Sequence, residues 1–169
     1  MDNIMVVQEV LHSMRSKQGK SCYMAIKIDL EKAYDRINWS FIRDTLMGMQ
    51  LSILLIEIIM MCVTSSKMQV LWNGQPMDKF VPSRGIRQGD RLSPYLFVMC
   101  MERLNQVIEE AIAKEEWSPV RCCRNGPQLS HLFFADDIVL FVEASVHHAL
   151  VIKKCLAKFW DASSQRVSL

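Results

Sequence analysis

The sequence has little net charge: 20 Lys and Arg residues face 18 Asp and Glu residues, a formal balance of +2. Strong overall basicity, a frequent mark of nucleic-acid-binding proteins, is therefore missing. A long apolar run is missing too, because the longest, Leu51 to Val63, contains Ser52 and Glu57 and falls short of the roughly 20 residues that span a bilayer. We therefore expect no membrane partner.

The cysteines lack the spacing of a metal site. None of the six forms a C-x-x-C pair, and Cys122 and Cys123 are adjacent, which suits a tetrahedral zinc site poorly. The acidic, polar start Met1-Asp2-Asn3 does not resemble a secretory signal peptide. These features predict reduced thiols in an intracellular protein, in the nucleus or cytoplasm, with no targeting signal.

The chain has the size and apolar content of a single folded domain. It contains 169 residues, of which 50% are hydrophobic, and this excludes a disordered tail or a charged linker. Apolar spacing and capping residues predict alternating stretches of helix and strand. Helices are expected at 3–14, 38–47 (capped by Asn38 or Ser40 and ended by Gly48), 52–62 (from Ser52), 94–112 (after the cap Ser93) and 146–160; strands are expected at 23–30, 67–72, 80–81 and twice within 129–142, with irregular connections at 16–21, 82–93 and 118–128. Helices mixed with antiparallel hairpins favour an α+β fold.

Two adjacent carboxylates, Asp136 and Asp137, lie inside an apolar segment, 132–142. Ionised neighbours repel each other, and an apolar environment raises that cost. One interpretation is a hairpin turn that uses Asp, a residue turns favour. The other is that a divalent cation such as Mg²⁺ offsets the repulsion.

A third carboxylate, Asp29, ends the strand predicted at 23–30. If both strands belong to one sheet, three carboxylates meet at one edge, which suits the two cations of phosphoryl transfer. Asp29 could equally cap the next turn. The loop 84–93 adds two glycines and three arginines before a helix start, a set of groups suited to binding an anion or to a solvated surface loop.

Three segments together resemble successive motifs of reverse transcriptases. Their sequences are most similar to those of non-LTR (LINE-type) retrotransposons, particularly the plant elements. They are K-I-D-L-E-K-A-Y-D at 27–35, G-I-R-Q-G-D-R-L-S-P-Y-L-F at 85–97 and F-A-D-D at 134–137. The resemblance runs from about residue 3 to 169 and implies a polymerase palm, an antiparallel sheet with helices packed on one face, plus part of the fingers.

The resemblance also implies roles. Asp29, Asp136 and Asp137, with the backbone carbonyl of Leu30, would hold two Mg²⁺ ions, or Mn²⁺, for RNA-directed DNA synthesis from dNTPs on an RNA template and DNA primer. Tyr34 would screen the sugar 2′ position. Gln88 and Gly89 would lie against nucleotide and template, and Arg87 would contact phosphate. No specific protein partner is implied.

Departures from the family pattern accompany these matches. Ser164 stands where related sequences usually carry Gly. Finger elements before residue 3 and a thumb after residue 169 have no counterpart, so we expect a single partial, truncated domain over 1–169. Two alternatives stay open. One is a non-catalytic retrotransposon remnant with at most weak nucleic-acid binding. The other is a splicing maturase, which the sequence around Asp29 fits less well.

Overall fold

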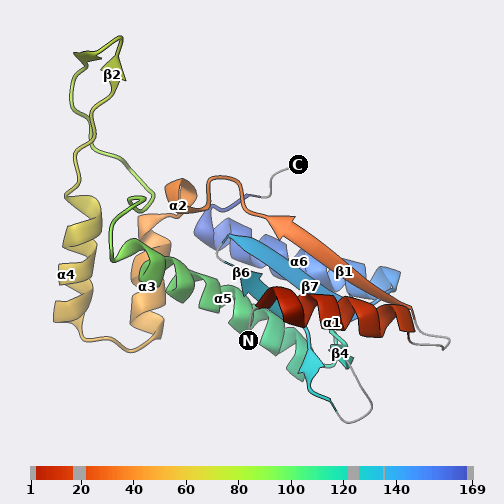
Figure 1. Cartoon of the computed structure of the whole chain (residues 1–169). Coiled ribbons are helices and arrows are strands. Elements are labelled where there is room, and N and C mark those ends of the chain that lie inside the picture. The colour runs from red at the N-terminus through yellow and green to blue at the C-terminus, as the bar shows by residue number, and fades with distance from the viewer. Residues whose placement is uncertain (1–2, 17–21, 122–125, 135, 167–169) are drawn as a thin grey trace. The chain divides into compact units, whose positions relative to one another are not determined.

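The computed structural model describes residues 3–16, 22–121, 126–134 and 136–166. The chain divides into two compact units, which we describe separately (Figure 1). Unit 1 comprises Met1–Glu31, Leu104–Trp160 and Arg166–Leu169, and unit 2 comprises Lys32–Arg103 and Asp161–Gln165. Among the described helices, none is long and apolar enough to cross a membrane.

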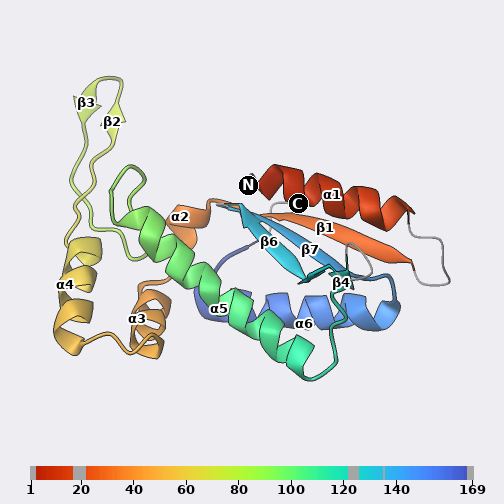
Figure 2. The ribbon, with the colours of Figure 1, turned by 60° about the horizontal axis from the view of Figure 1, so that its bottom comes forward.

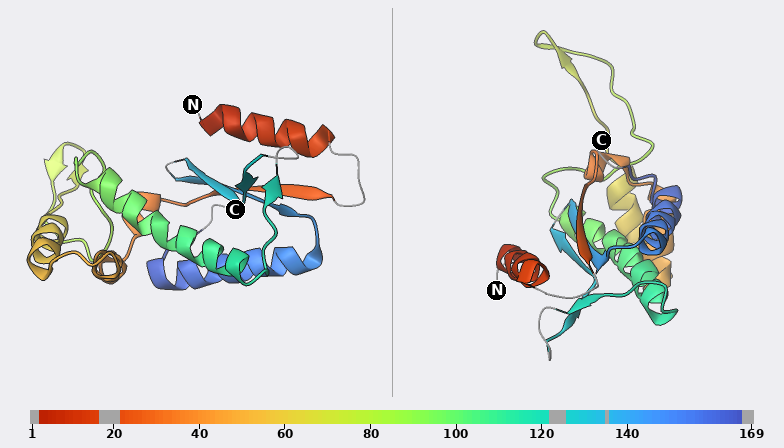
Figure 3. Two further views of the ribbon diagram at one scale, coloured as in Figure 1. Left: turned by 90° about the horizontal axis from the view of Figure 1, so that it is seen from below. Right: turned by 90° about the vertical axis from the view of Figure 1, so that its right-hand side faces the viewer.

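Unit 1 is built on a three-stranded antiparallel sheet with the order β1-β7-β6. The strands are β1 (Tyr23–Asp29), β6 (His131–Phe134) and β7 (Asp137–Glu143). A second ladder pairs β4 (Val120–Arg121) with β5 (Gln128–Leu129). Helix α1 (Asn3–Ser16) lies against one face of the sheet, while α6 (Val146–Ser163) and the second half of α5 (Ser93–Ala113) lie on the other (Figures 2 and 3).

Alternation along the strands explains this layering. On β7, Ile138, Leu140 and Val142 are buried on the face that meets α5 and α6. Phe141 points the opposite way and forms a small core with Val10 of α1, around which further apolar side chains pack. Apolar side chains on both faces of the central strand thus require cover on both faces, so α1 covers the face opposite α5 and α6, whereas helices were predicted on one face.

Unit 2 is mostly helical. It contains α2 (Ala33–Arg36), α3 (Trp39–Gly48), α4 (Ile53–Thr64), the first part of α5, and a short hairpin of β2 (Leu71–Trp72) and β3 (Gln75–Pro76). The expected caps are present. Asn38 Oδ1 accepts a hydrogen bond from the Ser40 amide at 3.0 Å, and Ser52 Oγ accepts one from the Leu55 amide at 3.3 Å. The side chains of Ile42, Leu46, Ile56, Leu96 and Phe97 are among the buried residues of this unit.

Several local predictions were wrong in detail. The hairpin β4–β5 lies partly within the stretch expected to be irregular, and the single turn α2 was not predicted. Gly48 belongs to α3, and Gln50, at φ +58°, adopts the left-handed conformation after it. Of the strand expected at 67–72, only Leu71–Trp72 is regular, although Met68 does pair with Phe80. The expected turn at 16–21 falls almost wholly outside the described residues.

Candidate active site

Two of the three carboxylates predicted to meet lie opposite each other at one end of the sheet in unit 1. Asp29, the last residue of β1, is the direct cross-strand partner of Asp137, the first residue of β7. Paired residues project from the same face, so these two side chains are neighbours. Asp136 lies exposed in the turn just before β7. The register of two strands thus joins positions that are remote in the sequence.

Leu30 follows Asp29 with a side chain that is only 3% exposed. An aliphatic side chain has no metal-ligating atom, so the backbone carbonyl is the one group through which Leu30 could contribute to a metal site.

Lys27 is a member of this cluster that the sequence analysis did not single out. It stands two residues before Asp29, on the same face of β1, and its Nζ lies 2.8 Å from Asp137 Oδ2. Its pKa is raised, first by the hydrogen bond and charge of Asp137 and more weakly by the charges of Asp29 and Asp136. The ammonium thus offsets part of the repulsion among the three carboxylates. The period of two along a strand could have revealed it.

The donor chemistry of this edge fits a divalent cation. Carboxylate oxygens are the protein ligands that Mg²⁺ prefers, and it usually binds one or two of them and fills its remaining positions with water and substrate phosphates. Asp29 and Asp137 meet that requirement. No group of three or more His, Cys, Asp or Glu side chains within the described part of the chain is placed to hold a metal by itself.

Tyr34 lies on α2 in unit 2 and is held from several sides. Its ring stacks on Phe97 of α5, with centroids 4.9 Å apart and planes 10° apart. The Tyr34 carbonyl accepts a hydrogen bond from the Ile86 amide at 2.8 Å. The preceding carbonyl, of Ala33, accepts one from Gln165 Nε2 at 2.8 Å. Gln165, which is 3% exposed, is a second residue that the sequence analysis missed, because no local pattern connects positions 33 and 165.

The arginine-rich loop is anchored at Gly85. Its amide donates to the Ile37 carbonyl at 2.8 Å, and its carbonyl accepts from Trp39 Nε1 at 2.7 Å. A Cβ at position 85 would lie 2.7 Å from the Asp35 carbonyl oxygen, so only glycine allows this approach.

Beyond this anchor, Arg87, Gln88 and Gly89 are all exposed, and Gly89 has φ +86°. These three residues share unit 2 with Tyr34, whereas Asp29, Asp136 and Asp137 share unit 1. The predicted site residues therefore form two groups, each positioned within its own unit.

Comparisons with known proteins agree with one another. The family described as reverse transcriptase (RNA-dependent DNA polymerase) matches residues 2–165. The Pol polyprotein of the type-2 retrotransposable element R2DM of Drosophila melanogaster is 30% identical over 155 residues, which are 92% of this chain and 14% of that protein. An uncharacterized mitochondrial protein of Arabidopsis thaliana is 46% identical over 65 residues, which are 38% of this chain and 53% of that protein.

Solved structures show the same fold at low identity. Telomerase from Candida albicans, in complex with a fragment of telomeric RNA, superposes with a TM-score of 0.68 at 12% identity and covers 99% of this chain and 29% of its own. Apo telomerase from Candida tropicalis, truncated from its C-terminal domain, superposes with a TM-score of 0.65 at 16% identity. The match covers 98% of this chain and 34% of that one. The chain thus spans only part of the length of these structures.

Proposed function

The chain belongs to the reverse transcriptase (RNA-dependent DNA polymerase) family, and we propose that its three carboxylates form the metal-binding centre for nucleotidyl transfer. Its mixture of helices and antiparallel sheet is the palm and fingers fold of these polymerases. The observation that supports the proposal is the direct pairing of Asp29 with Asp137, beside Asp136, at one sheet edge. We also propose that residues 1–169 act as one partial domain, a palm with part of the fingers.

The residues at the sheet edge of unit 1 bind the metal in this proposal. Asp29, Asp136, Asp137 and the Leu30 carbonyl hold Mg²⁺ or Mn²⁺. Two such ions, when bound, supply Lewis acidity toward the primer 3′-hydroxyl and neutralise charge on the departing pyrophosphate. No side chain in this proposal acts as a general base, so the protein's part is to position the reacting groups.

Unit 2 supplies the contacts to the substrates in this proposal. Tyr34 packs against the sugar of the incoming dNTP and screens its 2′ position. Its fixed ring plane on Phe97 and the hydrogen bonds to the adjacent carbonyls give that screen a defined place. Gln88 and Gly89 contact the nucleotide and the RNA template, and Arg87 contacts phosphate. The exposure of all three residues supports these roles.

Metal binding tests the proposal directly. We expect the purified chain to bind Mn²⁺, measured by electron paramagnetic resonance, and the variants Asp29→Asn, Asp136→Asn and Asp137→Asn to lose most of that affinity. Asp161→Asn is the matched control, because Asp161 is exposed and belongs to unit 2. Affinity that is unchanged in all three site variants would exclude this carboxylate edge as the metal centre.

Incorporation of labelled dNTP on an RNA template with a DNA primer tests the chemistry. We expect little or no synthesis by the chain on its own, because it spans 14% of the R2DM polyprotein and gripping the duplex needs a larger surface. Synthesis that disappears in Asp136→Ala would show that this chain suffices as a catalyst. Absence of both Mn²⁺ binding and nucleic-acid binding would instead indicate a non-catalytic remnant.

A further inference from the structure

Residues 67–81, here called the ribbon, form an exposed two-stranded hairpin in unit 2. Every residue of the ribbon is exposed. Trp72 pairs with Gln75 around the tight turn Asn73-Gly74, and Met68 pairs with Phe80 near the root. The ribbon projects away from α3 and α4 of the same unit (Figures 1 and 2).

One face of the ribbon is almost entirely apolar. Met68, Val70 and Trp72 alternate along the first strand and so share a face. Their partners on the second strand are Phe80, Met77 and Gln75, since the Met77 amide donates to the Val70 carbonyl at 2.9 Å. Two residues separate Met77 from Phe80 where one separates Val70 from Met68, so a bulge preserves the common face. We call Met68, Val70, Trp72, Met77 and Phe80 the apolar ribbon face.

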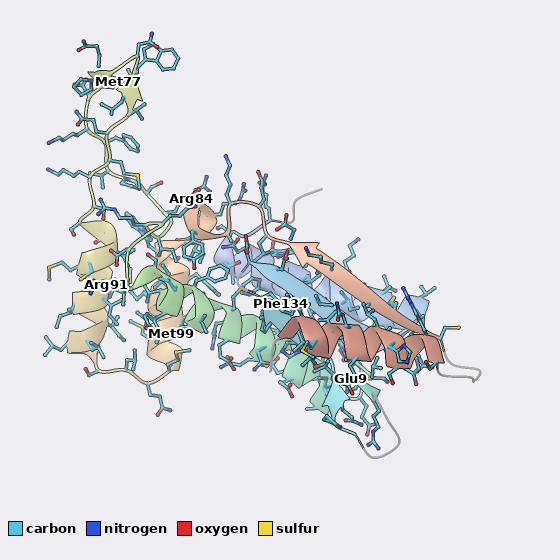
Figure 4. All side chains as sticks on the ribbon, viewed as in Figure 1. Glu9, Met77, Arg84, Arg91, Met99 and Phe134 are labelled. Carbon is cyan, nitrogen blue, oxygen red and sulfur yellow. The ribbon has the colours of Figure 1, made fainter. Side chains whose placement is uncertain are left out.

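This face is well exposed. Its side chains are between 39% and 68% exposed, with Trp72 the most open and Met68 the least. An isolated two-stranded ribbon is marginally stable in water, and contiguous exposed apolar surface marks an interaction site. The side chains of the ribbon stand clear of the helices (Figure 4, where Met77 is labelled).

A cavity lies at the root of the ribbon, within unit 2. Its volume is about 200 Å³, and its lining includes Met68 of the apolar ribbon face, Trp39, the basic residues Arg84 and Arg87, and one acidic residue, Asp35. An aromatic ring beside two guanidinium groups suits a planar base or a phosphate. Met68 thus belongs both to the apolar ribbon face and to the cavity that Arg84 and Arg87 line, next to the loop that carries Gln88.

Charge distinguishes nucleic acid from protein as the occupant. Although the whole chain is nearly neutral, residues 67–91 contain five basic side chains and two acidic ones, which are Lys67, Lys79, Arg84, Arg87 and Arg91 against Asp78 and Asp90. Aromatic rings that accept stacked bases, beside basic groups that follow the backbone, are the usual combination for single strands. A purely hydrophobic protein interface would not need this local excess of positive charge.

We propose that the apolar ribbon face binds single-stranded nucleic acid, with bases stacked on Trp72 and Phe80 and phosphates near Lys67 and Lys79. The proposal rests on the proposed function and extends it, because it places the unpaired template on this ribbon. Trp72 lies four positions after Met68, about 13 Å along the strand. This length accommodates about four stacked nucleotides.

Fluorescence anisotropy with a short, labelled single-stranded RNA tests the proposal on the full chain. We expect Trp72→Ala and Phe80→Ala each to weaken binding by about 5- to 100-fold, and Trp72→Phe to retain most of the affinity. Leu71→Ala is the matched control, because Leu71 is 69% exposed on the opposite side of the same ribbon. It should weaken binding less than about twofold.

Salt dependence provides an independent measurement. Replacing Lys67 or Lys79 with Gln should reduce the slope of log affinity against log salt by about 0.7 each, the value for one phosphate contact on a single strand. Asp136→Asn should leave RNA affinity intact, and Trp72→Ala should leave Mn²⁺ binding intact. Failure of the ribbon and failure of the metal centre are thus separable.

Three results would overturn the proposal. The first is that the wild-type chain shows no measurable RNA binding. The second is that Trp72→Ala and Phe80→Ala bind RNA as tightly as the wild-type chain. The third is that Leu71→Ala loses as much affinity as Trp72→Ala. Light scattering, which measures the oligomeric state, tests whether a second copy of the chain binds the apolar ribbon face instead. A dimer that Trp72→Ala dissociates without any change in RNA affinity would make the ribbon an interface between two copies of the chain.

Discussion

Gly85 offers a sharp test of how the arginine-rich loop is held. Its φ of +88° lies in the left-handed region, and a Cβ would meet the Asp35 carbonyl oxygen at 2.7 Å. The hydrogen bonds to Ile37 and Trp39 fix the Gly85 peptide from both sides. The loop cannot move away from an added methyl group without breaking at least one of them.

The cost of Gly85→Ala follows from two separate effects. A left-handed conformation costs a non-glycine residue about 1–2 kcal/mol. Overlap with a backbone atom that cannot yield adds about 1–3 kcal/mol. We therefore expect a loss of about 2–5 kcal/mol in the free energy of unfolding. Gly89 has nearly the same φ, +86°, with nothing within 4 Å of an added Cβ, so Gly89→Ala should cost only about 1–2 kcal/mol.

Urea unfolding followed by tryptophan fluorescence measures both losses. The comparison needs midpoints at an unchanged slope, since a changed slope would signal a changed unfolded state. With slopes of about 1–3 kcal/mol per molar urea, the midpoint of Gly85→Ala should lie below that of Gly89→Ala by on the order of 1 M. Equal midpoints for the two variants would refute the close approach of Gly85 to Asp35.

Three further outcomes are expected. Ser164→Gly should raise stability by about 0.5–1 kcal/mol, seen as a thermal midpoint a few degrees higher, because Ser164 has φ +62° and the relief of strain exceeds the added chain entropy; an unchanged or lower midpoint would contradict this. Burial raises the pKa of the Cys100 thiol to about 12. At pH 8, iodoacetamide should therefore label the exposed Cys22 and leave Cys100 unmodified until the protein unfolds, as measured by mass spectrometry. Equal labelling rates for the two cysteines would contradict the burial of Cys100. Lys27→Met should tighten Mn²⁺ binding by no more than about fivefold, since the ammonium that competes for Asp137 is removed, and weaker binding would show that Lys27 supports the site instead.

Local chemistry explains the successful predictions about the fold. Asn38 and Ser52 cap their helices because their side-chain oxygens satisfy amides within the same turn. Asn73 and Gly74 both have positive φ, as a two-residue hairpin requires. The strands β6 and β7 pair antiparallel, with Phe134 at the end of one opposite Asp137 at the start of the other, in agreement with the two strands predicted within 129–142. Each of these features depends on neighbours a few residues apart.

Weak local signals account for what was missed. The helix α2 is a single turn. Its N-cap residue, Lys32, adopts a left-handed conformation and makes no capping hydrogen bond with its side chain, so no capping pattern in the sequence predicts the helix. The strands β4 and β5 have two residues each and form through pairing with each other, not through their own alternation. Such short elements depend on the rest of the fold for their stability.

The family, the order of the longer helices and strands, and the carboxylates proposed for the chemistry could all be predicted from the sequence, because motifs, caps and turns depend on adjacent positions. Which distant residues meet depends on the tertiary structure. Sheet register, set by burial of alternate side chains, places Asp29 opposite Asp137 and brings the Lys27 ammonium to the same carboxylate. Packing of the segment 161–165 carries the Gln165 amide to the Ala33 carbonyl next to Tyr34. These contacts join positions far apart in the chain, so no local pattern contains them.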